Sequence, residues 1–158
     1  MDFAELIDKF GAQLGVEGLK LDGDGICRID VDGMVIAFRE IPEGNEVITW
    51  AEVGEPPPEG RERLYQVLLE SMFMGQGTAG CLFSYERDSG KLFLHRTDSL
   101  VLLDDRRFVQ NLESFVNLLD MWRRLIADFR PGAEDAGVSP QEESGLSNVF
   151  APDGFLQV

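Results

Sequence analysis

Apolar residues recur at helical spacing near both ends of the first 130 positions. In residues 3–14 they form one stripe: Phe3, Leu6, Ile7, Phe10 and Leu14. Asp2 can cap the start of this helix, and Gly15 follows its end. In the last helix the spacing is 4, 3, 4, 3, 4, 3: Phe108, Leu112, Phe115, Leu119, Trp122, Ile126 and Phe129. Both stripes predict amphipathic helices that pack on a core, the second capped by Asp104 or Asp105.

Apolar and polar residues alternate between these helices, as is typical of strands. The first three predicted strands are Cys27–Val31, Met34–Phe38 and Val47–Val53. Asp32-Gly33 is a two-residue hairpin signal, and Pro42–Asn45 supplies the next turn, which together predict an antiparallel meander. Later in the chain, Cys81–Glu86 and Leu92–Thr97 predict a second hairpin.

A middle helix is predicted from Gly60 or Arg61 to about Met74, after Pro56-Pro57-Pro58. It is apolar over more than the roughly 100° that one sheet can cover. We therefore expect a second subunit on this helix and a C₂ homodimer, with a buried central helix of a monomer as the alternative. The expected interface residues are Leu64, Val67, Leu68, Leu69, Met72 and Phe73.

The order helix, three strands, helix, two strands, helix predicts an α+β domain in residues 1–130, an antiparallel sheet flanked by helices. Residues 131–158 differ in kind, with five acidic residues, no Lys or Arg and several Gly and Pro. They predict an acidic tail with an apolar end. We hypothesise that Phe150 and residues 155–158 dock in an apolar groove of this chain or a neighbour.

Charge and composition narrow the function. The 158 residues suffice for one domain, and a net charge of −15 disfavours binding to nucleic acid or anionic lipid. No apolar run is long enough for membrane insertion, and the acidic start lacks the basic region of a secretory signal, so a cytoplasmic location is expected. Cys27 and Cys81 are expected to be reduced core thiols.

Residues 75–80 match the pattern G-x-G-x-x-G, but in the wrong context for a phosphate-binding loop. Such a loop follows a strand and opens a helix, so that the helix N-terminus faces the phosphates. Here the glycines follow a predicted helix and precede a strand. We therefore expect no cofactor, and we expect Gly75 and Gly77 to end the middle helix.

Candidate chemistry is sparse. His95 is the only histidine, and it has no nucleophile motif or second histidine to complete a catalytic or metal site. The acidic pairs Asp22-x-Asp24 and Asp30-x-Asp32 lack a third oxygen ligand, at Ile26 and Met34, and are better interpreted as turns. Paired catalytic carboxylates are not excluded, but no pair stands out. We predict no catalytic residue, no metal site and no enzyme activity.

Three segments resemble class I type III secretion chaperones, the CesT/Tir-chaperone family. They are Leu21–Cys27, Leu68–Phe73 continuing into Thr78–Leu82, and Leu112–Val116 through Trp122-Arg123. The resemblance covers about residues 3–130. It implies a small acidic cytoplasmic homodimer in a bacterium that binds the non-globular N-terminal region of a secreted effector and releases it at the secretion ATPase.

A groove for the effector is expected along the first helix and the meander. The residues predicted to contact it are Phe3, Leu6, Phe10 and Leu14, with Val47 or Trp50. An effector strand could also add to an open sheet edge. The alternatives are an adaptor or regulator of the same fold that binds a partner outside secretion and, more weakly, a hydrolase that uses acidic residues.

Overall fold

The computed structural model describes residues 2–16 and 19–132, and the hypothesis about Phe150 and residues 155–158 lies outside them. The elements follow the predicted order: α1 (Phe3–Leu14), β1 (Ile26–Val31), β2 (Met34–Ile41), β3 (Glu46–Gly54), α2 (Arg61–Met72), β4 (Leu82–Glu86), β5 (Lys91–Ser99) and α3 (Asp105–Asp128). Short 3₁₀ turns, η1 (Pro42–Gly44) and η2 (Phe73–Gly75), precede β3 and follow α2.

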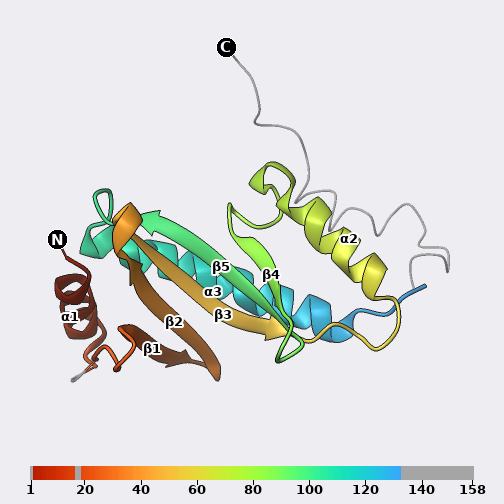
Figure 1. The fold of residues 1–158 in the computed structure, drawn as a ribbon, viewed down its shortest axis with the longest axis horizontal. Helices are drawn as coiled ribbons and strands as arrows, with labels where there is room; N and C mark the ends of the chain where they lie inside the picture. Colours follow the sequence, from red (N-terminus) through yellow and green to blue (C-terminus); the bar gives the residue numbers. More distant parts are fainter. Residues whose placement is uncertain (1, 17–18, 133–158) are drawn as a thin grey trace, which may run out of the picture.

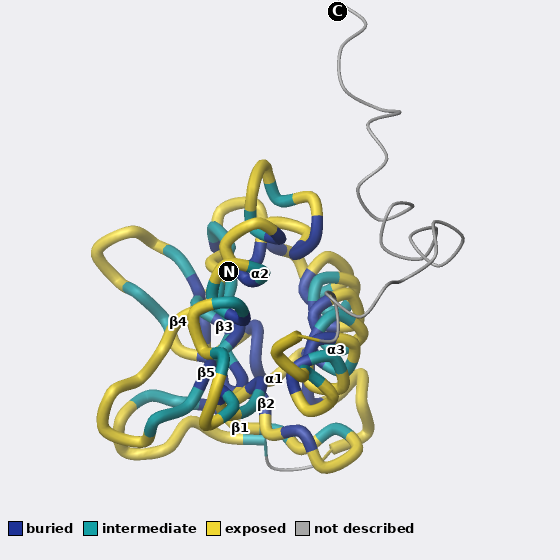
Figure 2. The backbone as a smooth tube through the Cα atoms, turned by 90° about the vertical axis from the view of Figure 1, so that its right-hand side faces the viewer, coloured by how far each residue is buried: buried dark blue, intermediate teal, exposed yellow. Residues whose placement is uncertain are grey.

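The five strands form one antiparallel sheet in the order β1-β2-β3-β5-β4. The second hairpin therefore joins the meander through β5 beside β3, and β1 and β4 are the edges. The long helix α3 runs behind the sheet, with α1 towards one end and α2 towards the other (Figure 1). Viewed along the molecule, the helices lie on one side of the sheet (Figure 2). The predicted α+β fold is confirmed.

The core lies between the sheet and the helices. The α1 and α3 stripes supply Phe10 and Phe108, which pack against Phe38 of β2. The ring centroids of Phe10 and Phe108 are 5.0 Å apart, and those of Phe38 and Phe108 are 5.3 Å apart. Because these large rings come from three elements, they hold both helices on the sheet.

Local signals in the sequence account for the element ends. Asp2 Oδ1 accepts a hydrogen bond from the Glu5 amide at 2.8 Å, and Asp104 Oδ1 accepts one from the Arg107 amide at 2.8 Å. The two residues between β1 and β2, Asp32 and Gly33, have φ values of 52° and 78°, as a tight hairpin turn requires.

The end of α2 is earlier than predicted. The helix stops at Met72, and Met74 has a left-handed φ of 55°. The apolar pattern continues to Met74, but the chain turns there because Gly77 packs directly on the last helical turn. The Gly77 amide donates to the Ser71 carbonyl at 2.8 Å, which replaces a helical hydrogen bond.

Candidate protein-binding surfaces

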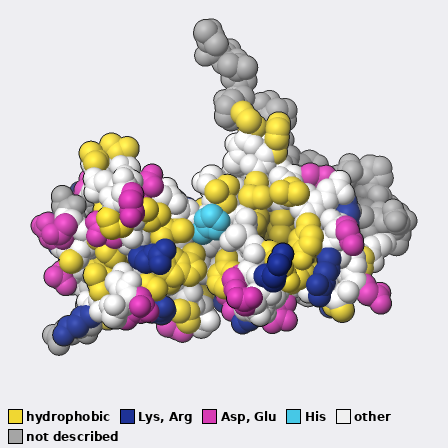
Figure 3. Space-filling view, in the orientation of Figure 1, with side chains coloured by type: hydrophobic (Ala, Val, Ile, Leu, Met, Phe, Trp, Pro, Cys, Tyr) yellow, Lys and Arg dark blue, Asp and Glu magenta, His cyan; other side chains and the backbone are white. Residues whose placement is uncertain are grey.

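The face of the sheet opposite the helices carries a strip of apolar side chains, here called the open sheet face. Its members are Ile48 and Trp50 on β3, Phe93 and His95 on β5, and Leu82 on β4. The register places Trp50 opposite His95, and His95 opposite Leu82. Figure 3 shows this side of the molecule, where apolar side chains gather among scattered charges.

The open sheet face contains a shallow hollow of about 350 Å³. It is lined by Ile48, Trp50, Ser84, Tyr85, Glu86, Phe93 and His95. Trp50 and Phe93 are half-buried, whereas Leu82 is 51% exposed. Aromatic side chains in a shallow apolar hollow suit contact with another polypeptide, because they bury a large area with few rotatable bonds.

Charged side chains lie beside this strip: Glu52 is opposite Phe93, and Glu86 lines the hollow. Lys91 Nζ contacts Glu52 Oε2 at 2.8 Å, and this hydrogen bond raises the pKa of Lys91. Glu86 accepts hydrogen bonds from Ser89, which lower the pKa of its carboxyl group. Burial lowers the pKa of His95, so the imidazole is neutral at pH 7 and belongs to the apolar strip.

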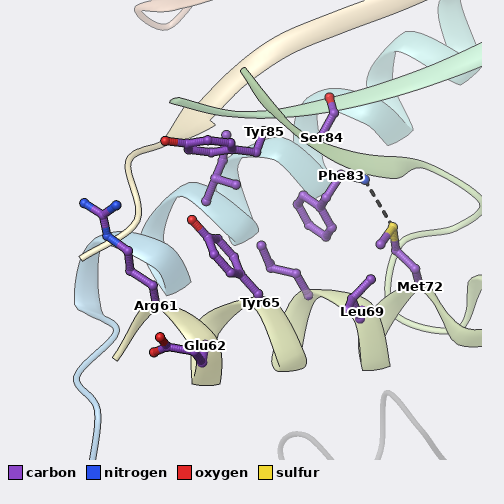
Figure 4. A pocket seen from close by; sticks show the side chains of 10 residues that line it. Arg61, Glu62, Tyr65, Leu69, Met72, Phe83, Ser84 and Tyr85 are labelled. Atoms are coloured by element: carbon purple, nitrogen blue, oxygen red, sulfur yellow. Dashed lines mark hydrogen bonds between the residues drawn. The ribbon is translucent and has the colours of Figure 1, made fainter. Parts of the chain in front are cut away.

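A second apolar surface lies between α2 and the edge strand β4, here called the α2–β4 groove. It has a volume of about 470 Å³ and is lined by Arg61, Glu62, Tyr65, Leu68, Leu69, Met72, Phe83, Ser84, Tyr85 and Leu92. Figure 4 shows Tyr65 and Leu69 rising from α2 towards Phe83 and Tyr85 of β4. The charged residues Arg61 and Glu62 lie at one end only.

Contacts within the α2–β4 groove hold its walls in place. The rings of Tyr65 and Tyr85 have centroids 6.3 Å apart. Phe83 packs edge-on against Trp122 of α3 at 5.0 Å, and its amide donates to Met72 Sδ at 3.2 Å. The groove is therefore a formed apolar surface beside an edge strand.

The residues predicted for the homodimer interface differ in exposure and fall into three pairs. Leu64 and Leu68 are buried in the core of the chain, and Val67 and Met72 are half-buried. Leu69 and Phe73 are 65% and 68% exposed, beside Met74 at 65%. Leu69 is therefore the exposed apolar residue of α2 among exposed polar side chains, and Phe73 and Met74 extend its apolar surface into the following turn.

The glycines of residues 75–80 form a packed turn. Gly75 and Gly80 have φ values of 71° and 82°, which only glycine adopts readily. Gly77 instead has a close neighbour, since a Cβ atom there would lie 2.9 Å from Ser71 Cβ. Its carbonyl accepts a hydrogen bond from Trp122 Nε1 at 3.2 Å. The turn follows a helix and leads into β4, so no helix N-terminus is available to hold a phosphate.

Most residues predicted to contact an effector lie in the interior. Phe3, Leu6, Phe10 and Val47 are at most 2% exposed, because the α1 stripe lies directly on the sheet and α3. A ligand cannot reach these four side chains while the helices stay packed on the sheet. Leu14 is 49% exposed at the end of α1, and Trp50 lies on the open sheet face, on the opposite side of β3 from Val47.

Three members of the open sheet face were not singled out from the sequence: Ile48, Leu82 and Phe93. A signal was present for two of them, since Ile48 and Phe93 alternate with the buried neighbours Val47 and Leu94. The alternation assigns them to the second face of the strand, but it does not say whether a helix covers that face.

Other chemistry is limited in the described part of the chain. No group of three or more His, Cys, Asp or Glu side chains there could hold a metal ion. Burial raises the pKa of both thiols, Cys27 and Cys81, which keeps them protonated. Within the same residues, no helix is long and apolar enough to cross a membrane.

Comparison with known proteins assigns the chain to a family. A sequence model described as the Tir chaperone protein (CesT) family matches residues 5–123. No curated protein sequence is a significant match.

Solved structures share the fold at low sequence identity. A chain of the ExsC–ExsE complex matches with a TM-score of 0.68 and 20% identity, covering 80% of this chain and 97% of that one. A chain of the HopA1–SchA chaperone–effector complex matches with a TM-score of 0.63 and 16% identity, covering 76% of this chain and 91% of that one. A chain of the complex of the Yersinia pestis type III secretion chaperone SycH with a fragment of YscM2 matches with a TM-score of 0.59 and 18% identity. The match covers 75% of this chain and 98% of that one.

Proposed function

This chain belongs to the Tir chaperone protein (CesT) family, and we propose that it binds the non-globular N-terminal region of a type III secreted effector and keeps it soluble and competent for secretion. Similar solved structures include chaperone–effector complexes. The chain acts in the bacterial cytoplasm, has no catalytic role and delivers its cargo to the secretion ATPase.

The open sheet face is the observation that carries this proposal. A strip of mostly apolar side chains from Ile48 to Leu82 lies on a sheet face that no helix of the described residues covers, in a chain with a net charge of −15. Like charge keeps such a surface from aggregating, while an apolar segment of a partner can still bury it. An effector segment bound there contacts Trp50, Phe93 and Leu82 in place of water.

Of the α1 residues predicted to contact an effector, only Leu14 is exposed. Leu14 is accessible and can extend the binding surface, whereas Phe3, Leu6, Phe10 and Val47 act as the support beneath it. These four side chains reach cargo only if the helices lift from the sheet.

A second copy of the chain covers the outer side of α2. Leu69 and Phe73 are large, apolar and well exposed, and the adjoining α2–β4 groove offers a complementary surface. A two-fold axis brings the same patch of each copy together, so both exposed sets are buried at once. The homodimer presents two open sheet faces to one effector segment.

Affinity capture from a lysate of the native host tests the effector proposal. The tagged full chain is expected to retain a secreted protein, and limited proteolysis of the complex is expected to protect an N-terminal segment of that protein. Substituting Trp50→Asp should weaken binding about tenfold or more, since truncating a buried aromatic anchor costs about 2 kcal/mol.

The matched control is Val101→Asp, which places the same charge on a turn residue that is 76% exposed. It should bind like the wild type, and both variants should keep the wild-type circular dichroism spectrum. Protection of a folded domain in a protein that is not secreted would contradict the proposal and favour the adaptor function.

A further inference from the structure

The α2–β4 groove has a polarity along its length. One end carries Arg61 and Glu62, and the rest is apolar, from Tyr65 to Met72 on α2 and from Phe83 to Tyr85 on β4 (Figure 4). Since α2 has twelve residues, the groove is about 18 Å long.

The chain leaves α3 at the charged end of this groove. A Cβ atom on Gly60, the residue before α2, would lie 2.3 Å from Pro131 Cβ, so the two segments are in direct contact. Figure 4 shows the chain beyond α3 passing beside Arg61. The last described residues after α3 therefore lie beside the charged end of the groove.

The sequence after residue 132 matches this groove in order and charge. Residues 133–148 contain four acidic side chains, Glu134, Asp135, Glu142 and Glu143, and no basic one. In the chain they come shortly after Arg130 and Pro131, and Pro131 is the residue that contacts Gly60 beside Arg61. The next ten residues, 149–158, are mostly apolar and include Val149, Phe150, Phe155 and Leu156.

The length of residues 133–148 also agrees with the length of the groove. A linker of 16 residues, from 133 to 148, has a root-mean-square span of about 20–24 Å as a coil. That span is close to the length of the groove, and a linker whose length matches the distance gives its highest effective concentration, on the order of millimolar.

We propose that residues 149–158 bind in the α2–β4 groove of their own chain and compete with the second copy for it. Phe150 and Phe155 take the apolar contacts with Tyr65, Leu69 and Phe83. This inference rests on the proposed homodimer, which it regulates. If the state with the segment bound is about tenfold more populated than the state with the groove empty, the dissociation constant of the homodimer rises about 100-fold. The factor is squared because both copies must release the segment before they associate.

Sedimentation equilibrium of the full chain tests the competition. The double substitution F150D/F155D should lower the dissociation constant of the homodimer at least about tenfold relative to the wild type. The control S139D/Q141D adds the same two charges without removing an apolar side chain, and it should associate like the wild type. Equal dissociation constants for all three chains would overturn the inference.

Crosslinking locates the segment independently of the homodimer. Under mild oxidation and at high dilution, L69C/F150C should form a disulfide within one chain, and the control L69C/S139C should form far less. A disulfide between chains, or equal yields for the two pairs, would overturn the inference. If F150D/F155D stays monomeric at every concentration, the homodimer proposal fails, and the crosslink alone decides whether the segment binds.

Discussion

On β3, the position of a residue in the strand decides whether its side chain is buried, more than its hydrophobicity does. Thr49 is 4% exposed and faces the helices, while its neighbour Trp50 lies half-buried on the open sheet face. Hydrophobicity alone would place them the other way round. A large aromatic side chain at a surface is suited to binding a partner, because contact with the partner removes its apolar area from water.

Thr78 presents a related conflict inside the molecule. It is fully buried, and its Oγ1 is the one buried side-chain polar atom of the described residues without a hydrogen-bond partner. Ser71, which packs against the same turn, donates from Oγ to the Leu68 carbonyl at 2.7 Å.

Substituting Thr78→Val should therefore raise the free energy of unfolding by about 1 kcal/mol, since an unpaired buried hydroxyl costs about 1–3 kcal/mol. Ser71→Ala should lower it by about 1 kcal/mol because a formed hydrogen bond is lost. Urea denaturation of both variants measures the two effects. A destabilised Thr78→Val variant would show that the hydroxyl has a partner.

His95 makes stability depend on pH. Burial holds its pKa below the ordinary value of 6.5, so the unfolded chain binds a proton at a higher pH than the folded chain. The stability that the neutral, buried His95 contributes is present above pH 6.5 and is lost as the pH falls towards the pKa of His95 in the folded chain. His95→Gln should flatten the dependence of unfolding free energy on pH between about 7 and 5.5, where most carboxyl groups stay ionised. An unchanged slope would assign the effect to other groups.

At the scale of elements, the junction of α2, the glycine turn and β4 organises both proposed surfaces. Gly77 brings the turn against Ser71, its carbonyl accepts from Trp122, and Met72 contacts the start of β4. Displacing this turn moves one wall of the α2–β4 groove and the edge of the open sheet face together.

Gly77→Ala tests the close packing. Its Cβ would lie 2.9 Å from Ser71 Cβ and 3.0 Å from the Ser71 carbonyl oxygen, so the turn must shift, at a cost of about 1–3 kcal/mol. The control Gly23→Ala has no atom within 4 Å of the new Cβ and should be neutral or slightly stabilising. Thermal unfolding measures both, and equal melting temperatures would contradict the packing argument.

At the scale of the whole molecule, apolar surface remains on two sides of an acidic chain. The open sheet face is suited to an extended partner, and the outer side of α2 to a second copy. The acidic surface keeps separate molecules apart, so association depends on local apolar contacts that outweigh the repulsion.

Leu69→Glu should convert the homodimer into a monomer, because it places a charge at the centre of the proposed apolar interface. Leu102→Glu is the matched control, since Leu102 is 66% exposed on the turn before α3. Light scattering of F150D/F155D chains carrying each substitution gives the molar mass without the competing segment. A dimer that survives Leu69→Glu would move the interface elsewhere.

The local pattern of the sequence was enough to predict the element order, the capping residue Asp2, a cap at Asp104 or Asp105, and the turn at Asp32-Gly33; the structure uses Asp104. These features depend on neighbours within a few residues, so a single stretch of chain contains their cause. The resemblance to the family rested on the same order of elements and on scattered positions, and the match of the family model to residues 5–123 confirms it.

The tertiary structure alone decided which apolar side chains remain at the surface. Period-two alternation in β3 and β5 separates Val47 from Ile48 and Leu94 from Phe93, but helix packing chooses the covered face. The predicted contact residues Phe3, Leu6 and Phe10 are buried for the same reason. Burial is a property of long-range packing, and only the fold brings α1 and α3 to one side of the sheet. The strand register then leaves Trp50 on the other side, opposite His95.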